Sequence, residues 1–172
     1  MTIGTQMIEL LRQLAEGDRS ALDGDGQTLS VPGEPLHATL ALFDHDRYSA
    51  TMRELVVASA GAPPADARAY LSAAAAEIAR RLSFLEEPLA VWELDGGEKL
   101  AQLRSSPPLR EGEAVSYWEV LLWSGDAPGA RLTRYRWAPD LTEREVVAYP
   151  ATFATMGRIA DNLAEALLAG QA

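Results

Sequence analysis

Cysteine is missing from this chain of 172 residues. The protein therefore has no disulfide framework, no thiolate nucleophile and no cysteine-based zinc or iron–sulfur site. Basic residues are also in short supply, since 15 lysines and arginines face 25 acidic residues and leave a formal net charge of -10. A surface of that charge repels a phosphate backbone, so we expect no nucleic-acid partner.

Long apolar runs are missing as well. The longest uncharged stretch in the middle of the chain, residues 55–65, is too short to cross a bilayer and contains Pro63 and Pro64. The first residues have no basic leader ahead of an apolar run and already carry Glu9 and Arg12, unlike a secretory signal. We therefore expect no membrane partner and a cytoplasmic location.

Motifs that carry catalysis are not found either. The sequence has no G-x-S-x-G nucleophile elbow and neither of the glycine-rich loops that cradle phosphates. His37 and His45 are the only histidines, so every triad or proton shuttle would have to use one of them. The sequence thus predicts no cofactor and favours a non-enzymatic role.

What the chain does contain is enough apolar material for one core, because 48% of its residues are hydrophobic. Its length fits a single α+β domain. Met7, Leu11 and Leu14 form one stripe of an N-terminal amphipathic helix, which is marginal alone and should pack against another surface. The domain has three parts, which are this helix, a turn-rich segment and the main body: residues 1–17, 18–35 and 36–172.

The first half of the main body is predicted to hold a strand, an ambiguous segment and a helix. Residues 36–43 are apolar at most positions, which indicates a strand buried on both faces, and residues 28–31 form a brief strand before it. Residues 49–60 fit a helix or a strand. A central helix is predicted over residues 65–85, with one apolar face: Leu71, Ala74, Ala75, Ile78, Leu82 and Leu85.

From Leu89 onward the apolar period changes from helical to alternating. Consecutive strands joined by short turns form an antiparallel meander, so we expect a five-stranded or larger sheet packed against the central helix and a C-terminal helix over residues 150–169. This order of elements resembles that of the helix-grip fold, in which a curved antiparallel sheet wraps a terminal helix and encloses an apolar ligand cavity. The strand candidates are residues 89–94, 99–105, 115–124, 130–138 and 144–149.

Apolar residues also suggest how the hairpins pair. With Gly96 and Gly97 as a two-residue turn, Trp92 lies opposite Ala101 on an apolar face. The next hairpin is ambiguous by one residue, and only one register collects the large apolar residues of both strands on one face: Trp118, Val120, Leu122, Thr133, Tyr135 and Trp137.

Glu119 lies in the most apolar strand of the predicted sheet, where an unpaired carboxylate is costly to bury. The chosen register places it beside Arg134 and Arg136, and Arg104 can extend the row. This row is either an ion-pair ladder or a site for an anionic ligand or an acidic partner, with two aromatic residues as its apolar floor. The candidate binding residues are Arg104, Tyr117, Trp123, Arg134, Arg136 and Glu119.

Two short stretches partly match metal-binding patterns. One resembles the acidic positions of a calcium loop, but Thr28 stands where the sharp turn needs glycine. The other is the polar turn that contains His45 and Asp46. We interpret both stretches as hydrated turns and expect no metal; the acidic residues of the first are Asp23, Asp25 and Glu34.

Two functions from different classes remain open on the sequence alone. The first is a non-enzymatic module that binds another protein or self-associates, through the exposed part of the sheet or the N-terminal helix. The second is a small-molecule carrier or enzyme with a cavity between the sheet and the C-terminal helix. A large pocket lined by tryptophan and leucine would distinguish the second function from the first.

Overall fold

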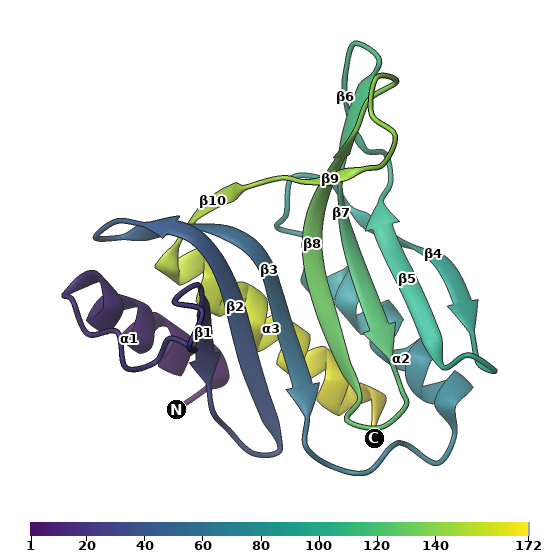
Figure 1. The fold of residues 1–172 in the computed structure, drawn as a ribbon. Helices are drawn as coiled ribbons and strands as arrows, with labels where there is room; N and C mark the ends of the chain where they lie inside the picture. Colours follow the sequence, from purple (N-terminus) through teal and green to yellow (C-terminus); the bar gives the residue numbers. More distant parts are fainter. Residues whose placement is uncertain (172) are drawn as a thin grey trace.

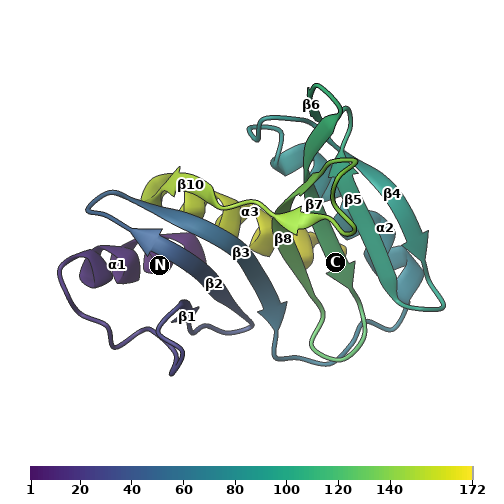
Figure 2. The same ribbon diagram turned by 45° about the horizontal axis from the view of Figure 1, so that its top comes forward.

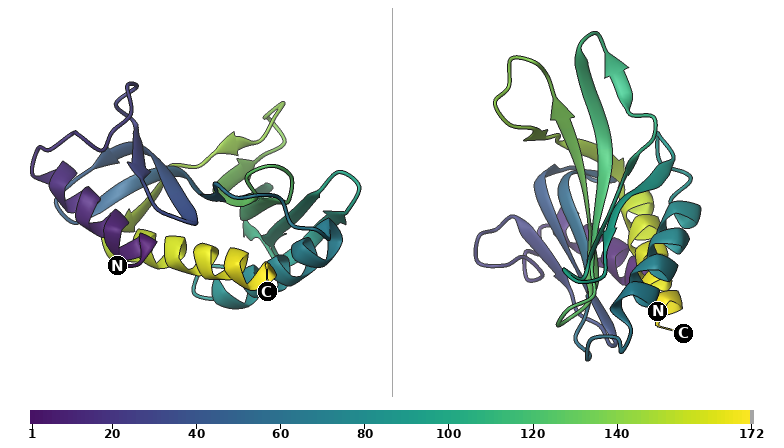
Figure 3. Two further views of the ribbon diagram at one scale, coloured as in Figure 1. Left: turned by 90° about the horizontal axis from the view of Figure 1, so that it is seen from below. Right: turned by 90° about the vertical axis from the view of Figure 1, so that its right-hand side faces the viewer.

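The computed structural model describes residues 1–171 and has helices on one side of an antiparallel sheet (Figure 1). The C-terminal helix lies between the other two helices, and all three cover the same face (Figure 3). None of the helices in these residues is both long enough and apolar enough to cross a membrane. The helices are α1 (Ile3–Ala15), α2 (Ala67–Arg81) and α3 (Phe153–Gly170).

The ten-stranded sheet has the order β1-β2-β3-β8-β7-β5-β4, with three short strands attached beside this path. The α+β fold with a large antiparallel sheet is therefore as predicted, whereas β6 was not predicted. The strands are β1 (Thr28–Val31), β2 (Leu36–His45), β3 (Ser49–Ser59), β4 (Leu89–Asp95), β5 (Leu100–Ser105), β6 (Leu109–Glu111), β7 (Ala114–Trp123), β8 (Gly129–Trp137), β9 (Glu145–Val146) and β10 (Tyr149–Thr152).

Two antiparallel meanders make up the sheet, one of β1, β2 and β3 and the other of β8, β7, β5 and β4. They meet only where β3 pairs with β8. This pairing joins Leu55–Ala58 to Gly129–Leu132. Beyond it the two strands diverge, and the segment 145–152 fills the gap between them (Figures 1 and 2). Its first part, β9, pairs with β8, and its second part, β10, pairs with β3.

The apolar stripe of α1 packs inside this chain. Met7 and Leu11 are completely buried, and α1 lies against α3. The two helices approach closely because glycines face each other: a Cβ on Gly157 would lie 2.7 Å from the carbonyl oxygen of Gly4 and 2.6 Å from Ile8. The amphipathic helix was expected to pack against another surface, and that surface is α3 of the same molecule.

The two other helices are shorter than predicted. α2 ends at Arg81, because the chain turns there to lead into Pro88 and β4, yet the whole predicted apolar face is buried. α3 begins at Phe153 because Pro150 pairs in β10, and the hydroxyl of Thr152 caps the helix by accepting a hydrogen bond from the Thr155 N–H.

Strands β2 and β3 lie in the first half of the main body, where the secondary structure of residues 49–60 was ambiguous. Residues 49–59 form a strand. In β2, Leu36, Ala38 and Leu40 are buried on the side that faces the helices. His37 and Thr39, which alternate with them, are only half-buried, so the predicted burial on both faces is wrong. The reason is that helices cover only one face of the sheet.

Both predicted hairpin registers are wrong. The first hairpin has a four-residue loop that joins Asp95 to Leu100, and a bulge beside Val91 leaves Trp92 62% exposed instead of opposite Ala101. In the second hairpin every pair is shifted by one residue. The covered face takes the smaller apolar residues of β8, so Leu132 pairs with Val120 and Ala130 with Leu122.

One continuous core runs through the molecule, from Met7 in α1 to Leu167 in α3. The predicted apolar stripe of α3 is buried throughout. Side chains with no exposed surface fill the space between the sheet and α3: Leu40, Leu55, Leu132, Met156, Ile159 and Leu163.

Candidate functional site

The sheet has one face that no helix of residues 1–171 covers (Figure 3). We call it the open face. Side chains alternate along each strand, so the pairing register assigns residues to it. Its central members come from β5, β7 and β8: Leu100, Gln102, Arg104, Tyr117, Glu119, Leu121, Trp123, Arg131, Thr133, Tyr135 and Trp137.

Glu119 lies at the centre of the open face and is only 4% exposed. Arg104 and Thr133 are its direct neighbours on the two adjacent strands. The carboxylate accepts a hydrogen bond from the amide of Gln102, lies 3.8 Å from Nη2 of Arg104 and lies 2.9 Å from Nη1 of Arg144. Its buried charge is therefore compensated by two guanidinium groups.

Arg144 reaches the open face from the segment just ahead of β9. Its guanidinium carbon lies 3.7 Å from the ring centroid of Tyr135, and Nη1 donates a hydrogen bond of 3.3 Å to the hydroxyl of Tyr117. Burial disfavours the charge of Arg144, but the bond to Tyr117 and the Glu119 carboxylate outweigh it and raise the pKa of Arg144. The group therefore stays cationic.

Arg104 is held between two aromatic rings. Its guanidinium carbon lies 5.1 Å from the ring centroid of Tyr117 and 5.5 Å from that of Trp92. Nε of Arg104 and Oγ1 of Thr133 are buried without a hydrogen-bond partner. We call this group the Glu119 cluster: Trp92, Gln102, Arg104, Tyr117, Glu119, Thr133, Tyr135 and Arg144.

The structure brings only part of the predicted site together. Arg104, Tyr117 and Glu119 are in contact as a group, whereas Trp123 lies farther along the open face and donates a hydrogen bond of 2.8 Å to the carbonyl of Ala127. Sequence reasoning missed five members: Trp92, Gln102, Thr133, Tyr135 and Arg144. Gln102 could have been found, because it lies two positions from Arg104 on one strand. The wrong registers placed Trp92 and Tyr135 on the covered face, and nothing in the sequence points from Arg144 or Thr133 to Glu119.

Arg134 and Arg136 are not beside Glu119, so that prediction is wrong. The shift of one residue turns both toward the opposite face, where Arg134 pairs with Trp118 across the strands. Arg134 forms two hydrogen bonds with Glu87, of 3.0 and 3.2 Å. Arg136 pairs with Glu145 at 3.1 Å near the surface.

The Glu87–Arg134 pair belongs to a polar network on the covered face. Glu87 also accepts a hydrogen bond of 2.8 Å from the Ser105 hydroxyl, and the Arg134 guanidinium lies 5.1 Å from the Trp118 ring. Both members of this pair are thus engaged with neighbours inside the fold, and we assign the pair a structural role.

Glu86 lies next to that network. It accepts hydrogen bonds from the hydroxyl of Tyr149 and from the indole N–H of Trp118, the latter of 2.9 Å. Burial disfavours the charged carboxylate, but these bonds outweigh it and lower the pKa of Glu86. Burial and the bond to Glu86 raise the pKa of Tyr149.

The residues of the partial metal patterns are engaged in turns. Asp25 accepts hydrogen bonds from the backbone N–H groups of Gln27 and Thr28, and Asp46 accepts two from the turn that follows it. These bonds lower the pKa of both carboxyl groups. Within residues 1–171 no three potential ligands are grouped to hold a metal ion. The other residues named in the sequence are placed as follows: Asp23 bonded to Ser30, and Glu34 and His45 at loop and strand ends.

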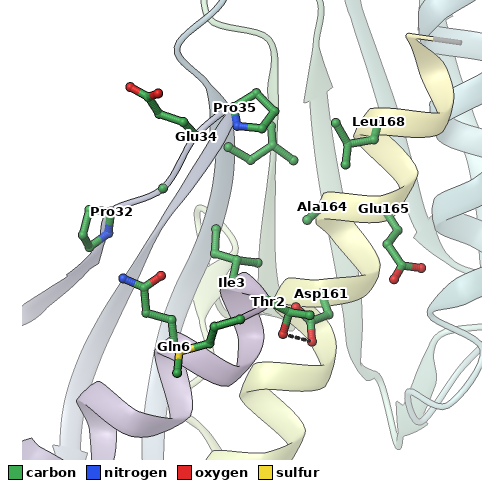
Figure 4. Close-up of a pocket in the computed structure, with 13 residues that line it drawn as sticks. Thr2, Ile3, Gln6, Pro32, Glu34, Pro35, Asp161, Ala164, Glu165 and Leu168 are labelled. Atoms are coloured by element: carbon green, nitrogen blue, oxygen red, sulfur yellow. Dashed lines mark hydrogen bonds between the residues drawn. The ribbon is translucent and has the colours of Figure 1, made fainter.

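A pocket of about 250 Å³ lies where the N-terminus of α1 meets α3 (Figure 4). The two carboxylates that α3 contributes are already used. Asp161 accepts hydrogen bonds from the Thr2 hydroxyl and the Gly4 N–H, of 3.0 and 2.7 Å, and Glu165 pairs with Arg81. α3 therefore presents no spare carboxylate to a ligand in this pocket.

Comparisons with protein-family models, with curated proteins and with solved structures find no match to this chain. A function therefore has to be inferred from the side chains themselves.

Proposed function

We propose that this chain is a non-enzymatic, cytoplasmic protein-interaction module that binds a partner protein on its open face. One observation carries the proposal: large apolar side chains are exposed on the face that the helices leave uncovered. Trp92 is 62% exposed and Trp137 is 41% exposed. Exposed aromatic residues grouped with arginines are typical of protein interfaces.

The position of the arginines supports the same proposal. Arg104 and Arg144 stack on aromatic rings, which fixes their guanidinium groups at the surface before any partner arrives. A preorganised side chain loses less conformational entropy on binding than a free one. The open face is thus ready to bind without rearrangement of its arginines.

The alternatives have less support. A carrier or enzyme would need room between the sheet and α3, where Leu55 and Ile159 are among the side chains that fill the core. Self-association through α1 would need an exposed apolar stripe, but Met7 and Leu11 of this stripe are already buried within the chain. We therefore favour a different protein as the partner and the sheet as the surface.

The test is site-specific photocrosslinking in the native host. A benzophenone amino acid at position 137 should crosslink to one defined partner, whereas the same group at Ser72, on the exposed side of α2, should not. Equal products from both positions, or none from position 137, would contradict the proposal. Products that contain only this chain would indicate self-association instead.

A further inference from the structure

We infer that the Glu119 cluster binds a carboxylate group of the partner, so that the segment docking on the open face is acidic. This inference rests on the proposed function and adds the chemistry of the partner. It follows from three features of the cluster, which are its charge balance, its exposure and its unpartnered polar atoms.

The cluster has an excess of positive charge. Arg104 and Arg144 share the single carboxylate of Glu119, so one positive charge is left over. The chain as a whole has a formal net charge of -10. A cationic spot on such a protein is a local exception, and it attracts an anionic group that most of the surface repels.

The positive groups face outward and the negative group does not. The side chains of Arg144 and Arg104 are 34% and 28% exposed, while that of Glu119 is 5% exposed. An approaching ligand therefore meets guanidinium groups first. Because Glu119 lies beneath them, it holds the arginines in place without blocking access.

Two buried polar atoms of the cluster lack a hydrogen-bond partner, Nε of Arg104 and Oγ1 of Thr133. The contrast with Arg134 is direct, since that arginine donates two hydrogen bonds to Glu87. A guanidinium matches a carboxylate through paired N–H groups. Arg104 has no carboxylate in such a position, since Glu119 lies 3.8 Å from its Nη2, and an acidic side chain of a partner would supply one at the exposed part of the Arg104 side chain.

An acidic peptide fits this face better than a nucleic acid does. Stacked arginines also bind nucleic acids, but a phosphate backbone carries charge along its whole length. It would have to pass Glu93, beside Gln102 at one edge, and Glu54, which lies 3.9 Å from Arg131. A peptide can place one carboxylate at the cluster and apolar side chains against Trp92 and Trp137.

The first test compares two labelled peptides by fluorescence anisotropy. One alternates glutamate with valine, and its control has glutamine in place of glutamate. We expect the glutamate peptide to bind about tenfold more tightly or better, with the difference lost at high salt. Equal affinities would overturn the inference.

Variants then locate the binding. Arg104→Gln and Arg144→Gln should each lower the affinity for the glutamate peptide about tenfold. Arg80→Gln, on the exposed side of α2, should leave this affinity unchanged. Thr133→Val removes a hydroxyl that is buried and has no partner, so it should keep both the fold and the affinity for the peptide. Full affinity in both arginine variants would contradict the assignment.

Two competitors separate the other sources of an anion. Free glutamate that displaces the peptide at the peptide's own concentration would show a small-molecule site, and an oligothymidylate that binds more tightly would show a nucleic-acid site. Either result overturns the acidic partner. The photocrosslink from position 137 is independent of both, so the proposed function can stand when this inference fails.

Discussion

Two carboxylates are buried on opposite sides of the same sheet. Glu87 lies on the covered face and Glu119 on the open face, and each meets arginine. The side chains of Glu87 and Arg134 are both under 10% exposed and form two hydrogen bonds with each other. Glu119 instead shares its charge between two arginines that remain partly exposed.

This difference separates a structural ion pair from a candidate recognition site. On the covered face the charges balance one to one, so the pair has nothing left to offer a ligand. On the open face the second guanidinium is in excess. A buried acidic residue is thus informative about function when its partners outnumber it and reach solvent.

Breaking the covered pair should have the largest effect. Arg134→Met leaves the Glu87 carboxylate buried without its cation, so we expect a loss of about 3–5 kcal/mol in the free energy of unfolding, measured by urea denaturation. The double variant Glu87→Gln/Arg134→Met removes the uncompensated charge and should recover part of that loss. A loss below about 1 kcal/mol in the single variant is typical of a solvent-exposed ion pair and would contradict a buried one.

Disturbing the helical cover should have the next largest effect. A Cβ at position 157 would meet Ile8 at 2.6 Å, so Gly157→Ala should cost about 1–3 kcal/mol by urea denaturation. Binding of the glutamate peptide should not change, because this contact lies between α1 and α3. A parallel loss of peptide affinity would mean that the two faces are coupled.

Neutralising the open cluster should have a smaller effect on stability. In Glu119→Gln the amide oxygen can still accept a hydrogen bond from Arg144, so we expect a loss of about 1 kcal/mol. The glutamate peptide should bind several-fold more tightly, because no carboxylate then neutralises the two guanidinium groups. Weaker binding would indicate that Glu119 acts mainly by orienting the arginines.

The smallest effect should appear in the pH dependence of stability. Because the pKa of Glu86 is lowered in the folded chain, its contribution is complete above the ordinary value of 4.5 and is lost as the pH falls through the folded pKa. Tyr149→Phe removes one of the bonds that lower this pKa. Its unfolding free energy should therefore fall less steeply in acid than that of the wild type, and an equal slope would exclude this role.

Local patterns predicted the fold well and the site poorly. The stripes of α2 and α3 repeat within one element, so the sequence identified their buried residues before any packing was known. Strand β8 has apolar residues on both of its faces, Leu132 on one and Tyr135 on the other, so its sequence alone does not determine the register with β7. The prediction placed the larger residues, including Tyr135, in the core, and this put Arg134 on the wrong face.

Arg144 shows why the rest of the site could not be predicted. It lies 25 positions from Glu119 along the chain, and it reaches the open face only because the 145–152 segment fills the gap between β3 and β8. No periodic pattern encodes such a contact. The predicted strand over residues 144–149 was in the right region, but its pairing depends on how the two meanders diverge.

The contact between α1 and α3 constrains the order in which the chain can fold during synthesis. The Gly4 N–H donates to Oδ1 of Asp161, 157 positions later. α1 therefore leaves the ribosome well before α3, with Met7 and Leu11 uncovered until α3 has been made. A chain cut short before Phe153 would expose this stripe and the covered face of both meanders together, which makes premature termination a direct route to aggregation.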